Sequence, residues 1–100
     1  MSPALVRLLE EVAAELPEAR SASVSGIITW SRAKIDFVVL APSGAEFRLD
    51  RPIAGAAVRT PDAGPSARGP EWVRFNPREL DGHAVDRARA WMELAYRRAE

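Results

Sequence analysis

The side chains of this 100-residue chain best suited to proton transfer or nucleophilic attack are those of His83 and Ser66. A serine nucleophile needs a neighbouring base, and His83 is the only histidine available. Asp81 and Asp86 flank His83, but positions 83 and 86 of a helix share a side only loosely. Ser66 also lacks the Gly-x-Ser-x-Gly setting of a nucleophile elbow. We therefore expect no catalytic residue, with His83 as a surface or capping residue.

Ser66 begins the segment Ser66-Ala67-Arg68-Gly69, within a long stretch rich in proline and glycine. We expect its hydroxyl and the Arg68 guanidinium to order this loop through backbone carbonyls, and anion binding by Arg68 is the alternative. No glycine-rich phosphate loop of known spacing is present. Zinc sites are built mainly from cysteine and histidine, and this chain has one histidine and no cysteine. We therefore expect no metal site and no cofactor.

Tryptophan and arginine offer a different chemistry, that of a contact surface. Trp72 and Arg74 share one face of a predicted strand, whereas Val73 and Phe75 share the other. If helices cover the Val73 side, Trp72 is accessible and can stack on a planar group or a partner side chain. The alternative is that one or both of Trp30 and Trp72 pack under the loop 60–70. The predicted contact surface consists of Trp30, Arg32, Lys34, Arg48, Arg68, Trp72 and Arg74.

Composition bounds the classes of function. One hundred residues make one domain, and 47% hydrophobic residues argue against disorder. The net charge is zero, and the excess of +3 in residues 19–80 (nine basic and six acidic groups) is too small to predict nucleic-acid binding by itself. No apolar run approaches the roughly 20 residues that span a bilayer. We expect a cytoplasmic protein without a membrane partner.

Periodic patterns predict two long helices. The first helix has Ser2 as its N-cap and Pro3 at its first position, and it ends before Pro17. The second follows Asp81 as N-cap and runs to the end of the chain. Its apolar stripe has helical spacing and comprises Ala84, Ala88, Trp91, Ala95 and Ala99, widened by Val85, Met92 and Tyr96.

Between these helices the sequence predicts strands over 22–30, 34–40, 46–50 and 72–75, with Gly26 marking a bulge or a close approach. Asp50 could cap a short helix within 50–59, and residues 60–70 are predicted to form a loop. The order is α-β-β-β-α-β-α. We expect an α+β fold with a four-stranded, mostly antiparallel sheet and the helices packed on one face.

This order resembles the MmcQ/YjbR-like small proteins, whose fold is described as a double wing. The matching motifs are Phe47-Arg48-Leu49, Ile53-Ala54, Thr60-Pro61, Trp72-Val73 and Ala95-Tyr96, over about residues 24–97. The final motif has Ala95 where the family pattern has serine, and the N-terminal part is short. The resemblance implies a single α+β domain over 1–100 and a role in DNA binding, and it supplies no catalytic residue.

Three functions follow from these observations. The first is a non-catalytic binding or accessory domain that contacts a protein partner through the exposed sheet face and the proline-rich loop. The second is a weak DNA-binding double-wing module that uses Arg32, Lys34 and Arg48. The third is a small-molecule binder or enzyme with a pocket under loop 60–70, near Arg68 and Trp72. Self-association through the edge strand of the sheet is compatible with each of them.

Overall fold

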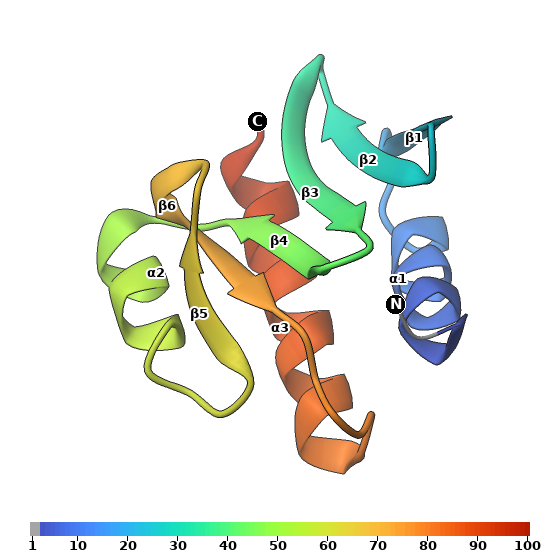
Figure 1. Ribbon diagram of the computed structural model, residues 1–100. Coiled ribbons are helices and arrows are strands. Elements are labelled where there is room, and N and C mark those ends of the chain that lie inside the picture. Colours follow the sequence, from blue (N-terminus) through green and yellow to red (C-terminus); the bar gives the residue numbers. More distant parts are fainter. Residues whose placement is uncertain (1–2) are drawn as a thin grey trace.

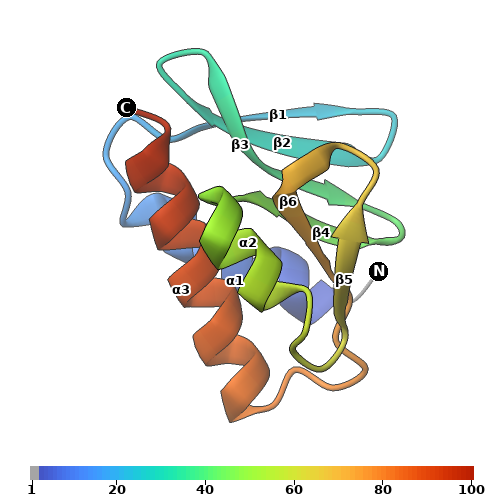
Figure 2. The ribbon, with the colours of Figure 1, turned by 90° about the vertical axis from the view of Figure 1, so that its left-hand side faces the viewer.

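The computed structural model describes residues 3–100, which form an α+β fold of three helices and one six-stranded antiparallel sheet (Figure 1). The sheet curves over the helices, which lie together on one side of it (Figure 2). The elements are α1 (Pro3–Ala14), β1 (Arg20–Val24), β2 (Ile27–Arg32), β3 (Ile35–Ala41), β4 (Gly44–Arg48), α2 (Arg51–Ala57), β5 (Ala63–Ser66), β6 (Gly69–Phe75) and α3 (Gly82–Arg98).

The strand order across the sheet is β1-β2-β3-β4-β6-β5. The predicted α+β class is confirmed, but the prediction of four strands is wrong, since two segments each contain a strand that the sequence patterns did not show. The first error lies at residues 22–30. Ser25 and Gly26 both have positive φ (51° and 80°) and form a two-residue turn, so that Val24 pairs with Ile27. Gly26 thus ends a strand, because positive φ at both positions is the signature of a type I′ hairpin turn.

The second error lies in the predicted loop 60–70, which contains β5 and the start of β6. Pro65 and Gly64 lower the strand propensity of this segment, and for this reason the sequence favoured a loop. Proline is nevertheless tolerated on an edge strand, where a missing N–H need not break the ladder. β5 is such an edge, paired only with β6, and the Ala67-Arg68 turn joins the two strands.

The hydrophobic core lies between the sheet and the helices. One row of cross-strand partners runs through the helix side of the sheet and is buried: Trp30, Val38, Phe47 and Val73. A β-bulge in β3 breaks the alternation and adds Phe37, which is fully buried beside Tyr96 with ring centroids 5.9 Å apart. The predicted stripe of α3 is confirmed, because Ala84, Ala88, Trp91, Met92 and Ala95 are buried. The helix α1 buries Leu5, Leu8, Leu9 and Val12 in the same core.

The predicted helix caps have different outcomes. Ser2 lies outside the described residues. Asp81 caps α3, since its Oδ1 accepts a hydrogen bond from the Ala84 N–H at 2.9 Å. Asp50 occupies the N-cap position of the predicted short helix α2 but makes no side-chain cap bond there. Its carboxylate accepts from Arg98 Nε at 2.8 Å instead and ties the end of α3 to the start of α2. Within residues 3–100, no helix is long and apolar enough to cross a membrane.

Candidate functional site

The side of the sheet away from the helices carries a cluster of arginines beside a tryptophan. Pairing of β4 with β6 places Glu46 opposite Arg74 and Arg48 opposite Trp72. Because residues alternate along a strand, all four point away from the buried row that contains Phe47 and Val73. We call Arg48, Arg68, Trp72 and Arg74 the arginine–tryptophan face. Arg68 reaches it from the β5–β6 turn.

Contacts within this cluster hold Arg68 in place. Its Nε lies 3.0 Å from Glu46 Oε1, and its guanidinium carbon lies 5.4 Å from the centre of the Trp72 ring. A cation at this distance from an aromatic face is attracted by the ring quadrupole. The Glu46 side chain is 14% exposed and that of Arg68 is 44% exposed, so the salt bridge is partly shielded from water. Arg74 is exposed, and Arg48 and Trp72 are half-buried.

Ser66 belongs to the same cluster. Its hydroxyl donates to Glu46 Oε2 and accepts from the Arg68 N–H at 3.1 Å. Ser66 therefore orders the hairpin turn, although its partner is a carboxylate and not the backbone carbonyl predicted from the sequence. This hydroxyl is already engaged by Glu46 and the turn, whereas His83 lines a separate cleft. The structure does not bring Ser66 and His83 together.

Trp30 and Arg32 do not belong to the face, which corrects the predicted contact surface. Trp30 is 2% exposed and packs on the helix side of β2, next to Ala13 of α1. Arg32 has the same strand parity and points the same way. Its guanidinium carbon lies 4.1 Å from the centre of the Tyr96 ring, and its Nη1 donates to the Tyr96 carbonyl at 3.2 Å. Trp30 and Arg32 lie two positions apart, so both side chains point to the covered side of β2 and pack against the helices.

Lys34 is exposed but lies in the turn between β2 and β3, where its φ is +69°. Arg32 points toward α3 and Arg48 points to the opposite side of the sheet. The three basic residues assigned to a DNA-binding hairpin therefore do not converge on one surface. The predicted residues that the structure does bring together are the four of the arginine–tryptophan face.

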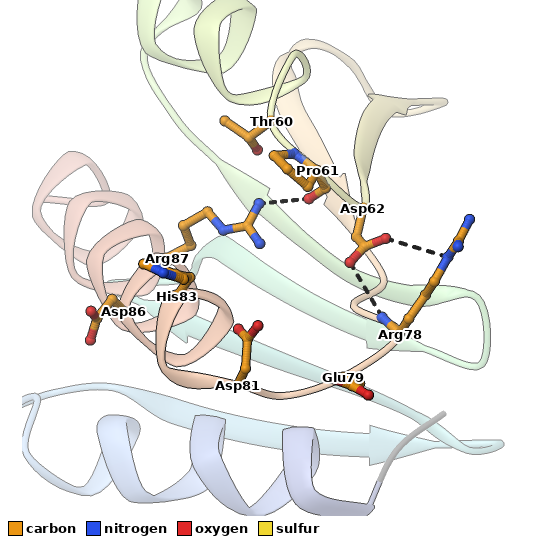
Figure 3. A pocket seen from close by; sticks show the side chains of 9 residues that line it. All are labelled: Thr60, Pro61, Asp62, Arg78, Glu79, Asp81, His83, Asp86 and Arg87. Carbon is orange, nitrogen blue, oxygen red and sulfur yellow. Dashed lines mark hydrogen bonds and ion pairs between the residues drawn. The ribbon is translucent and has the colours of Figure 1, made fainter.

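A second feature is a surface cleft of about 720 Å³ at the start of α3 (Figure 3). It lies beside residues 60–62 and not near Arg68 and Trp72, where a pocket was predicted. Arg87 crosses from α3 to donate to the Pro61 carbonyl at 2.6 Å, and Asp62 accepts from the Arg78 N–H at 3.4 Å. The lining residues are Thr60, Pro61, Asp62, Arg78, Glu79, Asp81, His83, Asp86 and Arg87.

The sequence singled out His83, Asp81 and Asp86 but gave no sign that residues 60–62 would face them. The antiparallel pairing of β5 with β6 places residues 60–62 beside the segment that follows β6, where the Asn76 N–H donates to the Asp62 carbonyl at 3.0 Å. Because β5 was not predicted, the sequence carried no signal for this approach. Asp62 and Arg78 meet across these ends, with Arg78 Nε 3.8 Å from Asp62 Oδ1. Among residues 3–100, no group of three or more acidic or histidine side chains is placed to hold a metal ion.

We expect replacement of Asp81 with alanine to lower the free energy of unfolding by about 1 kcal/mol, the usual value of an N-cap. The carboxylate satisfies the Ala84 N–H, which would otherwise lack an intrahelical partner. Urea unfolding followed by circular dichroism measures the loss. Asp81→Ser is the control, because a serine hydroxyl can accept the same bond, and equal losses in both variants would contradict a capping role.

Comparisons of the chain with protein-family models, with curated proteins and with solved structures found no match.

Proposed function

We propose that this protein is a non-catalytic binding domain that contacts an acidic segment of a protein partner through the arginine–tryptophan face. The observation that carries the proposal is the gathering of three arginines and a half-buried tryptophan on the helix-free side of β4 and β6. Tryptophan and arginine are the residues most often found at the energetic centre of protein interfaces.

The contacts of the face favour binding over chemistry. Arg68 is pre-positioned by Glu46 and Trp72, so little side-chain entropy remains to be lost when a partner binds. Glu46 neutralises one of the three arginines, which leaves Arg48 and Arg74 to attract carboxylates. The chain as a whole has zero net charge and a pI near 6.6, whereas nucleic-acid-binding domains are typically basic. This charge balance favours a protein partner over DNA.

Affinity capture from an extract of the source cells tests the proposal. The face variant carries Arg48→Glu and Arg74→Glu. The matched control carries Arg59→Glu and Arg97→Glu, an equal change of charge at two exposed positions outside the face. We expect a protein that wild type and control both retain and the face variant loses. Equal retention of the same proteins by all three forms would rule out the face as the contact site.

Intrinsic fluorescence provides a direct readout for a purified partner. Trp30 and Trp91 are 2% and 7% exposed, so that Trp72 is the tryptophan that a ligand can reach. Titration with single-stranded and duplex DNA tests the double-wing alternative, since phosphate contacts make affinity fall steeply with salt. Salt-dependent quenching by DNA that the face variant loses would identify nucleic acid, and not a protein, as the ligand of the face.

We also propose that this protein is related to the MmcQ/YjbR-like proteins. Its support is the order of elements along the chain: a strand meander, a short helix, a strand with Trp72-Val73 and a closing helix with Ala95-Tyr96. The departure at Ala95 lies in the core, where this residue is fully buried.

The cleft at the start of α3 supports a second candidate function, the binding of a small molecule that carries a positive charge. Its volume falls in the range of about 300–1,000 Å³ that is usual for ligand sites. Arg78 and Arg87 are engaged by Asp62 and the Pro61 carbonyl, whereas Glu79 and Asp86 are exposed at the rim. A thermal-shift screen of amines tests this function, and a hit whose effect survives Asp86→Asn and Glu79→Gln together would contradict it.

A further inference from the structure

We infer that the free edge of β1 is a self-complementary docking edge that pairs two copies of this chain through an antiparallel β1–β1 ladder. This inference does not depend on the proposed function, because β1 and the arginine–tryptophan face lie at different ends of the sheet. β1 and β5 are the two edge strands (Figure 1).

The β5 edge is blunted and the β1 edge is not. β5 has four residues, contains Gly64 and Pro65, and shifts register at Pro65. Short length, proline and irregular pairing are the features by which proteins prevent strand addition. β1 (Arg20–Val24) has the sequence Arg-Ser-Ala-Ser-Val, a regular register with β2, and all five residues exposed. It has neither proline nor lysine.

The turn that precedes β2 defines which backbone groups of β1 are free. Val24 and Ile27 flank a type I′ turn and therefore form a hydrogen-bonded pair. Bonding alternates along an antiparallel ladder, so the N–H and C=O groups of Ala22 also point toward β2. Those of Ser21 and Ser23 point outward. Neither serine makes another backbone hydrogen bond within residues 3–100.

An antiparallel two-fold axis through Ala22 matches these free groups to each other. Ser21 of each copy lies opposite Ser23 of the other, and each such pair exchanges both of its N–H···O=C bonds. Ala22 meets its own symmetry mate, and the small methyl groups allow the close spacing of a non-hydrogen-bonded pair. Val24 lies opposite Arg20 of the second copy, whose aliphatic stem covers it.

Two further observations favour a second copy as the occupant. Val24 is 69% exposed and Ile27 is 39% exposed, which makes them two of the three large hydrophobic residues exposed among the described residues. Both lie at the end of the β1–β2 hairpin, and Val24, on the edge strand itself, is partly covered by the pairing. The zero net charge of the chain imposes no overall repulsion between copies. Because only one edge of each copy is competent, the assembly closes as a two-fold dimer and does not grow into a filament.

Sedimentation equilibrium between about 1 and 200 µM protein, a range that brackets a micromolar Kd, tests the inference. We expect the wild type to shift from monomer to dimer across this range. Ser23→Pro removes an outward N–H without breaking the β1–β2 ladder and should be monomeric at every concentration. Its thermal unfolding should match that of the wild type at about 1 µM, where both are monomeric. Ser23→Ala keeps the N–H and should dimerise like the wild type. A wild type that stays monomeric throughout overturns the inference.

Ala22→Lys keeps the test decisive if Ser23→Pro does not fold. It places two ammonium groups face to face at the symmetry axis and should weaken the dimer at least tenfold, with partial recovery at high salt. Amide hydrogen exchange identifies the edge directly, because the Ser21 and Ser23 N–H groups should become protected as the concentration rises. A dimer that both variants leave intact, or one without this protection, overturns pairing through β1.

Discussion

Replacement of Trp91 with alanine should lower the free energy of unfolding by about 3–5 kcal/mol, the range for removal of a large aromatic side chain from a core. Trp91 of α3 is 7% exposed. Its ring centre lies 5.2 Å from that of Phe75 and 5.9 Å from that of Phe47, in edge-to-face arrangements. The substitution removes both contacts and leaves a cavity at the point where α3 meets β4 and β6. Urea unfolding followed by circular dichroism measures the effect.

Trp72→Ala is the matched control, since it deletes the same side chain from the helix-free face. Trp72 is half-buried, and its ring contacts the Arg68 guanidinium instead of a core aromatic ring. We expect a loss below about 1 kcal/mol, the usual size of a cation–π contact at an exposed site. Equal losses for the two tryptophans would show that the sheet does not have one covered and one free side.

Gly44→Ala should destabilise the protein by about 3 kcal/mol or more, because a backbone conformation and a close approach both require glycine. Gly44 opens β4 with φ at +128°, in the left-handed region. An added Cβ would lie 2.7 Å from the Phe75 carbonyl oxygen and 2.9 Å from the Asn76 Cβ. The first of these is a backbone atom of the paired strand β6, so relief requires the β4–β6 ladder to move. Thermal and urea unfolding measure the loss.

Gly55→Ala provides the opposite control. Gly55 lies within α2, and an added Cβ would meet no atom within 4 Å. The methyl group reduces the conformational freedom of the unfolded chain and favours the helix, so we expect stabilisation by about 0.5–1 kcal/mol. A loss for Gly55→Ala, or a negligible effect of Gly44→Ala, would contradict the geometry described for the two positions.

The two proposed interaction surfaces are separable by design. The arginine–tryptophan face is built by β4, β6 and the β5–β6 turn, whereas the docking edge is the outer side of β1 at the other end of the strand order. Charge reversal at Arg48 and Arg74 should therefore leave the dimer unchanged. Ser23→Pro should leave intact the contacts of Arg68 with Glu46 and Trp72.

The elements that the sequence alone determined are those stabilised by a local pattern. The stripe from Ala84 to Ala99 predicted α3, and Asp81 predicted its first residue, because a helix is defined by contacts three and four positions apart. The alternation of Ile35, Phe37 and Val39 with Lys34 and Asp36 likewise predicted β3. The sequence patterns did not predict the hairpin turn at Ser25-Gly26 or the strand that contains Pro65, because a turn and an edge strand carry little periodicity.

The contact surface could not be read from the sequence for a related reason. The sequence identified Trp72, Arg74, Arg48 and Arg68 as surface residues, but it gave Trp30 and Arg32 the same status. When the pairing register of a strand shifts by one residue, every side chain moves to the other face of the sheet. The residue types of a strand therefore do not reveal which side the helices cover. Pairing of Trp30 with Val38, and of Arg48 with Trp72, sets that parity. Only the tertiary structure decided it, because the pairing of β4 with β6 and the helices that cover one side join segments distant in the chain.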